Sequence, residues 1–169
     1  MVYKIRLILD TVEDVLREIV ISYNDTLEDL HNAITNAYGF YGTEMASFYR
    51  TDDKWNQGEE IPLFSMSKSK DAISMGKLAL KDVLTEDNDK LIYVYDFFCM
   101  WTFYVELITI EEDENLIELP SLIFSLGVVP SEAPQKEFVS EDLNNDPDDY
   151  DSLENFDDFD FDNFDEMTN

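Results

Sequence analysis

The sequence predicts a folded domain built from a β-sheet and one main helix, followed by an acidic tail. The stretch 91–107, LIYVYDFFCMWTFYVEL, is rich in the aromatic and β-branched residues that are typical of strands. Residues 27–38, LEDLHNAITNAY, carry apolar side chains at helical spacing. From position 141 onward the chain holds 13 acidic residues and no Lys or Arg. We therefore expect a domain at 1–130 and a low-complexity tail at 131–169.

Composition limits the classes of partner. The 169 residues carry a net charge of −28, and 44% of them are hydrophobic, which is enough for a core. The remaining 26 of the 39 acids and all 11 bases lie in 1–140, so the body is also acidic, at −15. A field of this sign repels phosphate, so we expect no direct nucleic-acid binding. It favours basic partners.

The central feature is a predicted pair of strands, Lys90–Asp96 and Trp101–Ile110, joined by a tight connection at Phe97–Met100. Both alternating faces are apolar, as in strands that are covered on both sides. The run is broken by Asp96 and Glu106 and is shorter than the roughly 20 residues of a membrane helix, so we expect no membrane span.

The N-terminal part predicts a hairpin and then the helix. Val2–Leu9 alternates as a strand, and Val15–Ile21 is expected to return beside it. Asp25 or Thr26 is the expected N-cap, and Gly39 the expected end of the helix. The side chains at helical spacing predict a buried face made of Leu27, Leu30, Ile34, Ala37 and Tyr38.

The remaining segments of the body are less regular. We expect a strand at Met45–Arg50, a polar turn at 51–60 and a short strand at Ile61–Met66. Residues 67–77 are expected to form a loop, and Leu78–Leu84 one or two helical turns. The segment 121–128, SLIFSLGV, is expected to pack on the sheet as an extended segment or as a short helix.

Two single residues are possible reactive groups. His31 is the only histidine and lies in the predicted helix; we expect an exposed or boundary side chain rather than a general base, which would need an orienting carboxylate. Cys99 is the only cysteine, which excludes an intramolecular disulfide. With no basic residue near it in the sequence, we expect a buried, inert thiol.

Carboxylates among aromatic residues are the other possible site. Asp96 and Glu106, with Trp101 beside them, could form a pocket in which a raised pKa supports acid–base chemistry, or they could simply end strands or face water. The acidic segment 51–60 lacks the spacing of a calcium loop, and the five glycines match no phosphate-binding fingerprint. We predict no metal, no cofactor and no catalytic residue.

The tail combines charge with aromatic rings. Its Asp residues keep it open and soluble, so we expect disorder, while its Phe rings stay available to a partner. A basic groove with apolar pockets could receive such a peptide. The tail could equally mimic a nucleic acid on a DNA- or RNA-binding protein, or it could only make the chain soluble. The expected contact residues are Phe156, Asp157, Asp158, Phe159, Asp160, Phe161, Asp162, Phe164 and Asp165.

Several segments resemble the plasmid pRiA4b ORF-3-like family, whose function is unknown. They are Leu16–Arg17, TLEDLHNAITNAYGF at 26–40, Met45–Phe48, LKDVLTEDNDKLIYVYDF at 80–97, Trp101 and Glu106–Leu107. The resemblance covers roughly 2–120. It implies an α+β fold in which a mostly antiparallel sheet packs on one main helix, in a ubiquitin-like, β-grasp-like manner.

The chain departs from the pattern of that family at the central hairpin. Phe98 stands where the family has Gly, Cys99 where it has a second Asp, and Phe103 where it has His. The resemblance therefore implies that any activity of relatives at this hairpin is lost here.

We expect a non-catalytic interaction or regulatory protein whose acidic, aromatic tail docks on a basic protein. An enzyme or degenerate enzyme with a carboxylate site at the hairpin is one alternative. An accessory protein of plasmid or mobile-element origin is another, and it rests on the resemblance alone. The N-terminus lacks the features of a signal peptide, so the expected location is the cytoplasm.

Overall fold

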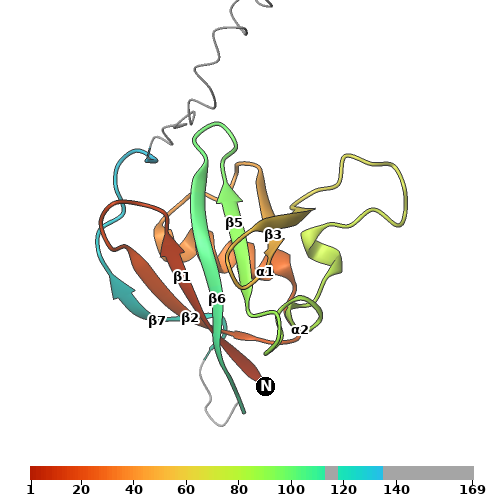
Figure 1. Cartoon of the computed structure of the whole chain (residues 1–169), viewed down its shortest axis with the longest axis horizontal. Helices are drawn as coiled ribbons and strands as arrows, with labels where there is room; N and C mark the ends of the chain where they lie inside the picture. Colours follow the sequence, from red (N-terminus) through yellow and green to blue (C-terminus); the bar gives the residue numbers. More distant parts are fainter. Residues whose placement is uncertain (113–117, 135–169) are drawn as a thin grey trace, which may run out of the picture. The chain divides into compact units, whose positions relative to one another are not determined.

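The computed structural model describes residues 1–112 and 118–134. One compact unit spans Met1–Pro134. Its centre is a seven-stranded sheet with the order β4-β3-β5-β6-β1-β2-β7, in which every described pair of neighbouring strands is antiparallel (Figure 1). The expected α+β class with a mostly antiparallel sheet is confirmed.

The N-terminal hairpin and the helix follow the sequence closely. Strands β1 (Val2–Leu9) and β2 (Leu16–Ser22) pair directly. Helix α1 (Leu27–Tyr38) begins at Thr26, whose hydroxyl accepts from the Asp29 backbone N–H while the Asp29 carboxylate accepts from the Thr26 N–H. This reciprocal capping box decides between the two expected caps. Gly39 follows the helix at φ 74°, a left-handed conformation that glycine adopts without strain.

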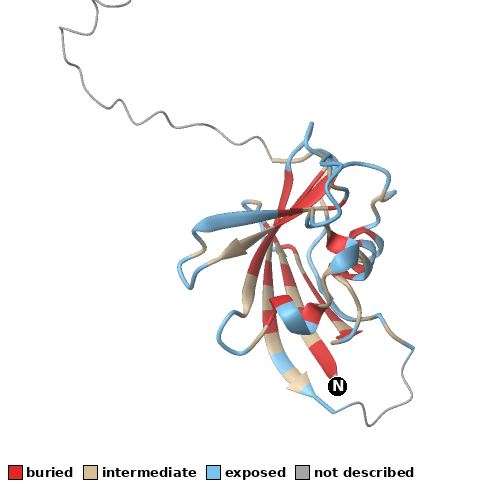
Figure 2. Ribbon diagram, turned by 90° about the vertical axis from the view of Figure 1, so that its right-hand side faces the viewer, coloured by how far each residue is buried: buried red, intermediate tan, exposed pale blue. Residues whose placement is uncertain are grey.

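The core lies between α1 and one face of the sheet. Figure 2 shows buried segments (red) concentrated where the helix and the strands face each other. Leu27, Leu30, Ile34 and Tyr38 are buried as expected, whereas Ala37 is half-buried. From the sheet, large side chains that are fully buried include Ile5, Leu7, Ile19, Phe48, Tyr93 and Phe103.

The central hairpin is confirmed. Strands β5 (Lys90–Tyr95) and β6 (Trp101–Glu111) pair from Tyr95 opposite Trp101 to Lys90 opposite Glu106. Strand β5 is bordered by β3 and β6, and β6 by β5 and β1, so both are interior strands of the sheet. In β5 every residue from Leu91 to Tyr95 is buried, so both of its faces are covered, whereas burial alternates along β6 after Phe103.

The region between β3 (Ala46–Thr51) and β5 corrects one boundary. Strand β4 is Gln57–Pro62, not the expected Ile61–Met66, and the polar turn is therefore shorter. The strand has the polar sequence QGEEIP, and its first four residues are exposed. It is the outermost strand of the sheet, with β3 on one of its two edges. A 3-10 turn, η1 (Met75–Lys77), lies within the expected loop, and α2 (Leu80–Val83) occupies the expected helical turns.

The last described strand is β7 (Ser121–Leu126), which pairs with β2 at the other edge of the sheet. Of the two expectations for this segment, the extended one is confirmed. The expected tail contacts at 156–165 lie outside the described residues. No helix in the described part of the chain is long and apolar enough to cross a bilayer.

Candidate aromatic site

A cavity of about 360 Å³ lies at the end of the β5–β6 hairpin. Three segments that are distant in the sequence meet there: the residues after α1, the β5–β6 turn and the residues after β7. In Figure 1 this turn is the green loop at the top of the sheet. We call the cavity and its rim the aromatic site; it is lined by Tyr38, Gly39, Phe40, Tyr41, Thr43, Glu44, Tyr95, Asp96, Trp101, Val129, Pro130 and Ser131.

Packed rings form the floor of the aromatic site. Phe40 stacks on Tyr95 with centroids 5.0 Å apart and an interplanar angle of 10°. The Trp101 ring is also 5.0 Å from that of Phe40. The Tyr95 hydroxyl accepts a 3.0 Å hydrogen bond from the Gly42 N–H, which holds the loop after α1 against the hairpin. The rings are therefore fixed by packing and by one polar contact, so the floor is preformed.

The turn that borders the floor is tight. Asp96 and Met100 both adopt left-handed backbone conformations, with φ of 59° and 61°. One oxygen of the Asp96 carboxylate accepts from the N–H groups of Phe98 and Cys99, at 3.1 and 3.4 Å. The Met100 N–H donates to the Asp96 carbonyl at 2.6 Å. Asp96 thus organises the turn with one carboxylate oxygen and its own carbonyl.

The charge at the rim is negative. Glu44 and Asp96 line the cavity, and none of the described residues that line it is Lys or Arg. A hydrogen bond to Asp96, together with the fields of Asp96, Glu44 and Glu132, raises the pKa of the Cys99 thiol. The negative charges of Asp96, Glu44 and Glu132 therefore all raise the pKa of this thiol, which lies in the turn that borders the cavity.

Cys99 also corrects an expectation. The thiol is exposed rather than buried, because it lies in the turn itself and not in a strand. Its raised pKa keeps it in the protonated form, which is a poor nucleophile. The expected low reactivity is therefore consistent with the structure, but for a different reason.

Large apolar side chains are exposed in the two segments that border the aromatic site, the loop after α1 and the β5–β6 turn. Tyr41 and Phe98 are each 97% exposed. Met45, whose carbonyl accepts from the Asp96 N–H, is also exposed, as are Phe97 and Met100 of the turn. Exposed apolar groups gathered around a cavity are typical of binding surfaces.

Glu106 does not line the aromatic site. It lies opposite Lys90 on β6, five ladder positions from the Tyr95–Trp101 pair, or about 17 Å along the strands. Its carboxylate is 3.9 Å from Lys90 Nζ. Asp96 and Trp101 thus come together, but the two carboxylates do not share a pocket.

His31 is buried, contrary to the expected exposed or boundary position. The ring is 2% exposed, and its Nδ1 lies 2.6 Å from the Tyr93 hydroxyl. It occupies the position four residues after Leu27, on the buried face of α1, so helical spacing places it inside. Burial lowers the pKa of His31, and it does not line the aromatic site.

Arg17 lies behind one wall of the aromatic site. Its guanidinium carbon is 5.1 Å from the centroid of the Tyr38 ring. The guanidinium donates to the carbonyls of Leu16, Leu126 and Gly127, so it fixes the end of β7 to β2. It does not line the cavity.

Sequence reasoning identified Asp96 and Trp101 but missed Phe40, Tyr41 and the segment 129–131. Phe40 and Tyr41 follow Gly39, the residue that ends α1. Two aromatic residues in a connection between a helix and a strand were the signal that could have indicated a binding surface there. Nothing in the sequence indicated that residues after β7 would reach the same place, because this depends on the order of strands in the sheet.

The acidic turn after β3 is held by its own contacts. The Asp52 carboxylate accepts from the N–H groups of Lys54 and Asn56 and from the Asn56 side-chain amide. The hydrogen bond from the Asn56 side-chain amide is the main cause that lowers the pKa of Asp52, and the bonds from the backbone N–H groups lower it further. Within 1–112 and 118–134, no group of three or more His, Cys, Asp or Glu side chains is arranged to hold a metal ion.

Comparisons with known proteins agree with the resemblance noted above. A family model described as plasmid pRiA4b ORF-3-like protein matches residues 1–168. A crystal structure of a protein of unknown function from Methanosarcina mazei Go1 superposes with a TM-score of 0.63 and 25% identity, covering 73% of this chain and 68% of that one. No curated protein matches. The chain belongs to the plasmid pRiA4b ORF-3-like family.

Proposed function

We propose that this protein is a non-catalytic binding protein for a basic protein partner. The observation that carries the proposal is the aromatic site, where stacked rings form the floor and carboxylates lie at the rim. Cationic side chains are attracted both by carboxylates and by the faces of aromatic rings. A Lys or Arg side chain of the partner fits this chemistry.

The exposed apolar groups add a second source of affinity. Tyr41 and Phe98 offer rigid surface that a partner can cover. The body as a whole is acidic, so a basic protein approaches an attractive field. Charge speeds the encounter, and the rings hold the partner in place.

The tail is the second element of the proposal. Its Asp and Phe residues between 156 and 165 act as a further docking segment for the same basic partner, as the composition suggests. Regulation of that partner is the proposed role. A location in the cytoplasm and the absence of direct nucleic-acid binding belong to the same proposal.

A carboxylate-based enzyme is less well supported, because the aromatic site contains Asp96 but not Glu106, and one oxygen of Asp96 already accepts two backbone hydrogen bonds. The ubiquitin-like, β-grasp-like topology also remains a proposal; the β1–β2 hairpin that leads directly into α1 supports it.

The test is a capture experiment from native host lysate at low and moderate salt, followed by affinity measurement with the purified captured protein. Four forms are compared: the full chain, a chain ending at Ser140, the double variant Tyr41→Ala/Phe98→Ala, and Glu44→Gln. Met66→Ala and Glu13→Gln are matched controls, because both residues are exposed and neither lines the aromatic site.

We expect a basic protein whose affinity falls about tenfold or more in the double variant and falls further without the tail. Rising salt should weaken binding because charges are screened. Equal affinity for all forms, or a captured partner that is acidic, would contradict the proposal.

A further inference from the structure

The chain reaches the aromatic site from β7 through a short segment, residues 127–134, which we call the strap. Val129, Pro130 and Ser131 of the strap line the cavity, so the strap forms one of its walls. In Figure 1 it is the light blue segment that rises from β7 toward the β5–β6 turn. Val129 and Ala133 also pack against the core. The shape of the aromatic site therefore depends on where the strap is held.

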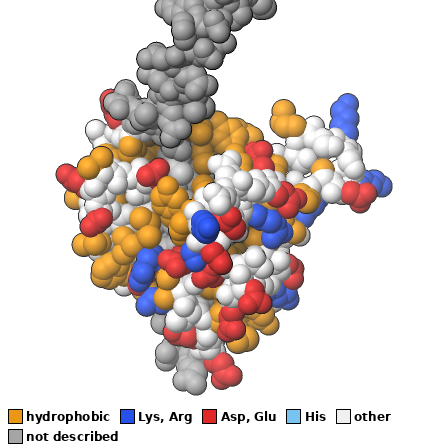
Figure 3. All heavy atoms as spheres, in the orientation of Figure 1, with side chains coloured by type: hydrophobic (Ala, Val, Ile, Leu, Met, Phe, Trp, Pro, Cys, Tyr) orange, Lys and Arg blue, Asp and Glu red, His pale blue; other side chains and the backbone are white. Residues whose placement is uncertain are grey.

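Strand β7 gives the strap little support. Of the seven described strands, β7 alone has no buried residue. In Figure 3, hydrophobic atoms lie at the surface on the side where Figure 1 places β7. Segments with few buried contacts open locally at a low cost in free energy. The strap therefore needs attachments beyond the backbone pairing of β7 with β2.

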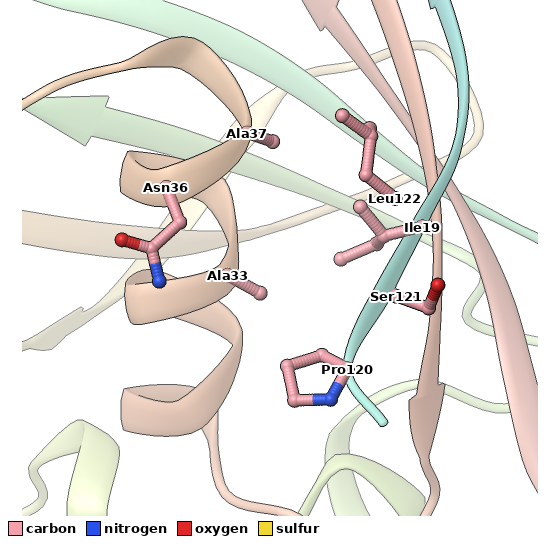
Figure 4. Close-up of a pocket in the computed structure, with 7 residues that line it drawn as sticks. All are labelled: Ile19, Ala33, Asn36, Ala37, Pro120, Ser121 and Leu122. Carbon is pink, nitrogen blue, oxygen red and sulfur yellow. The ribbon is translucent and has the colours of Figure 1, made fainter. Parts of the chain in front are cut away.

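The start of β7 is loosely packed. Figure 4 shows Ala33 and Ala37 of α1 facing Pro120 and Leu122. A groove of about 190 Å³ lies between them. Because two small side chains and a groove separate the helix from the strand, dispersion contacts are few at this place. A firm attachment has to lie at the other end of β7.

Arg17 provides an attachment at that end. Its side chain is 8% exposed and donates to the carbonyls of Leu126 at 2.8 Å and Gly127 at 3.2 Å, where β7 ends and the strap begins. Hydrogen bonds from a charged donor are stronger than those between neutral groups. The guanidinium carbon also lies 5.1 Å from the centroid of the Tyr38 ring, which lines the cavity. One buried cation thus joins two lining segments without lining the cavity itself.

Gly127 is the second attachment point. Its φ of 80° lies in the left-handed region, and a Cβ atom at this position would overlap the carbonyl oxygen of Asp14 in the β1–β2 turn. Glycine is therefore required where the strap leaves β7. The strap begins at a place that is fixed both by Arg17 and by close contact with this turn.

The geometry points to Arg17 as the positioning residue of the aromatic site, which holds the strap and the Tyr38 ring at the spacing that a cationic side chain of the partner requires. The nature of this ligand rests on the proposed function, whereas the position of the strap can be measured without a ligand. A preformed wall spares the ligand the cost of ordering it.

The charge of Arg17 makes this role distinguishable from a general effect. Arg17 is itself a cation and repels a cation in the cavity, so loss of its charge alone should strengthen binding. Loss of the positioned strap should weaken binding. The sign of the change in affinity therefore separates the two effects.

Quenching of Trp101 fluorescence by acrylamide measures the position of the strap. Trp101 lines the same cavity and is 8% exposed, and Trp55→Phe removes the other tryptophan. In this background, Arg17→Met and Gly127→Ala should each raise the quenching constant about twofold or more, because both release the strap. Arg50→Met removes a cation that does not line the aromatic site and should leave the constant unchanged.

Titration with Nα-acetylarginine amide, a single cation, measures the effect on binding. We expect Arg17→Met and Gly127→Ala to bind this probe about fivefold or more weakly than the unaltered chain. Arg17→Lys keeps a cation that can donate to the same carbonyls, so it should recover part of the affinity. Circular dichroism at the temperature of the titration checks that each variant is folded.

Two results would overturn the inference: unchanged quenching in both Arg17→Met and Gly127→Ala, or tighter binding of the probe by Arg17→Met. An unaltered chain that does not bind the probe would instead contradict the proposed cation site, and the quenching constants would still decide the role of Arg17. If Arg17→Met does not fold, Gly127→Ala and Arg17→Lys carry the test, because neither removes the positive charge.

Discussion

The Nδ1 atom of His31 lies 2.6 Å from the hydroxyl of Tyr93, inside the layer between α1 and β5. Burial lowers the pKa of His31 and raises that of Tyr93, so both groups stay neutral near pH 7. The contact is therefore a hydrogen bond between neutral groups in the core, and it links the helix to a central strand.

This relationship predicts a loss of stability in mild acid. Below the ordinary histidine pKa near 6.5, the unfolded chain binds a proton that the folded chain does not. The free energy of unfolding should therefore fall by about 1.4 kcal/mol per pH unit until the folded pKa is reached. Urea unfolding between pH 5 and 8 measures the slope, and His31→Gln should remove this component. Since His31 is the only histidine, equal slopes in both proteins would refute the prediction.

A second prediction concerns Glu18. The hydrogen bond from Arg6 is the main cause that lowers its pKa, and Lys4 Nζ lies 3.4 Å from the carboxylate. A lowered pKa contributes stability that is fully present above about pH 4.5, the ordinary value, and is lost as pH falls through the folded pKa.

Glu18→Gln should accordingly lower the free energy of unfolding by about 1.5 kcal/mol at pH 7 and by less at pH 3. Thermal unfolding at both pH values measures it. Glu59→Gln, at an exposed pair with Arg50, is the control and should change stability by less than about 0.5 kcal/mol. A Glu18→Gln effect that is as large at pH 3 would contradict the assignment.

Arg17 provides a third prediction, on local stability. Because its guanidinium donates to Leu126 and Gly127, Arg17→Met should release the end of β7 and cost about 2 kcal/mol. Hydrogen exchange should become faster at the amides of 121–128 than elsewhere in the sheet. Arg50→Met, at a half-buried position on β3 whose side chain is 41% exposed, is the matched control. Uniformly faster exchange would show that Arg17 supports the whole core instead.

The turn between β5 and β6 gives a fourth prediction. Met100 has a φ of 61°, a conformation that costs an ordinary residue about 1 kcal/mol. Met100→Gly should therefore raise the free energy of unfolding by about 0.5 kcal/mol, since relief of strain outweighs the entropy of glycine. Met100→Val should lower it. Destabilisation by Met100→Gly in urea titrations would show that the methionine side chain stabilises the turn by packing.

The two hairpins and the helix could be predicted from local pattern. Thr26 and Gly39 mark the ends of α1, and the apolar run around β5 and β6 marks interior strands. Strand β4 could not be located, because an edge strand such as QGEEIP lacks apolar alternation. The positions of His31 and Cys99 were wrong for opposite reasons. His31 was expected near the surface because histidine is polar, although its helical spacing places it on the buried face of α1. Cys99 was expected to be buried because its neighbours in the sequence are apolar, although the turn exposes it.

The aromatic site was only half predictable. Asp96 and Trp101 flank one turn, so their proximity follows from the hairpin alone. Phe40 and Val129 arrive from other segments, and their meeting depends on the order of strands in the sheet. Glu106 belongs to the same hairpin as Asp96 but lies far from it. Asp96 is next to the turn, whereas Glu106 pairs with Lys90 at the other end of the two strands.

The exposed thiol of Cys99 is a natural attachment point for a fluorescent label that detects ligand binding. As the only cysteine of the sequence, it accepts a single dye in the turn that borders the aromatic site, and no cysteine has to be introduced. The carboxylates around it keep it protonated, so labelling calls for mildly alkaline buffer. A fluorophore there reports directly when a ligand covers the rings.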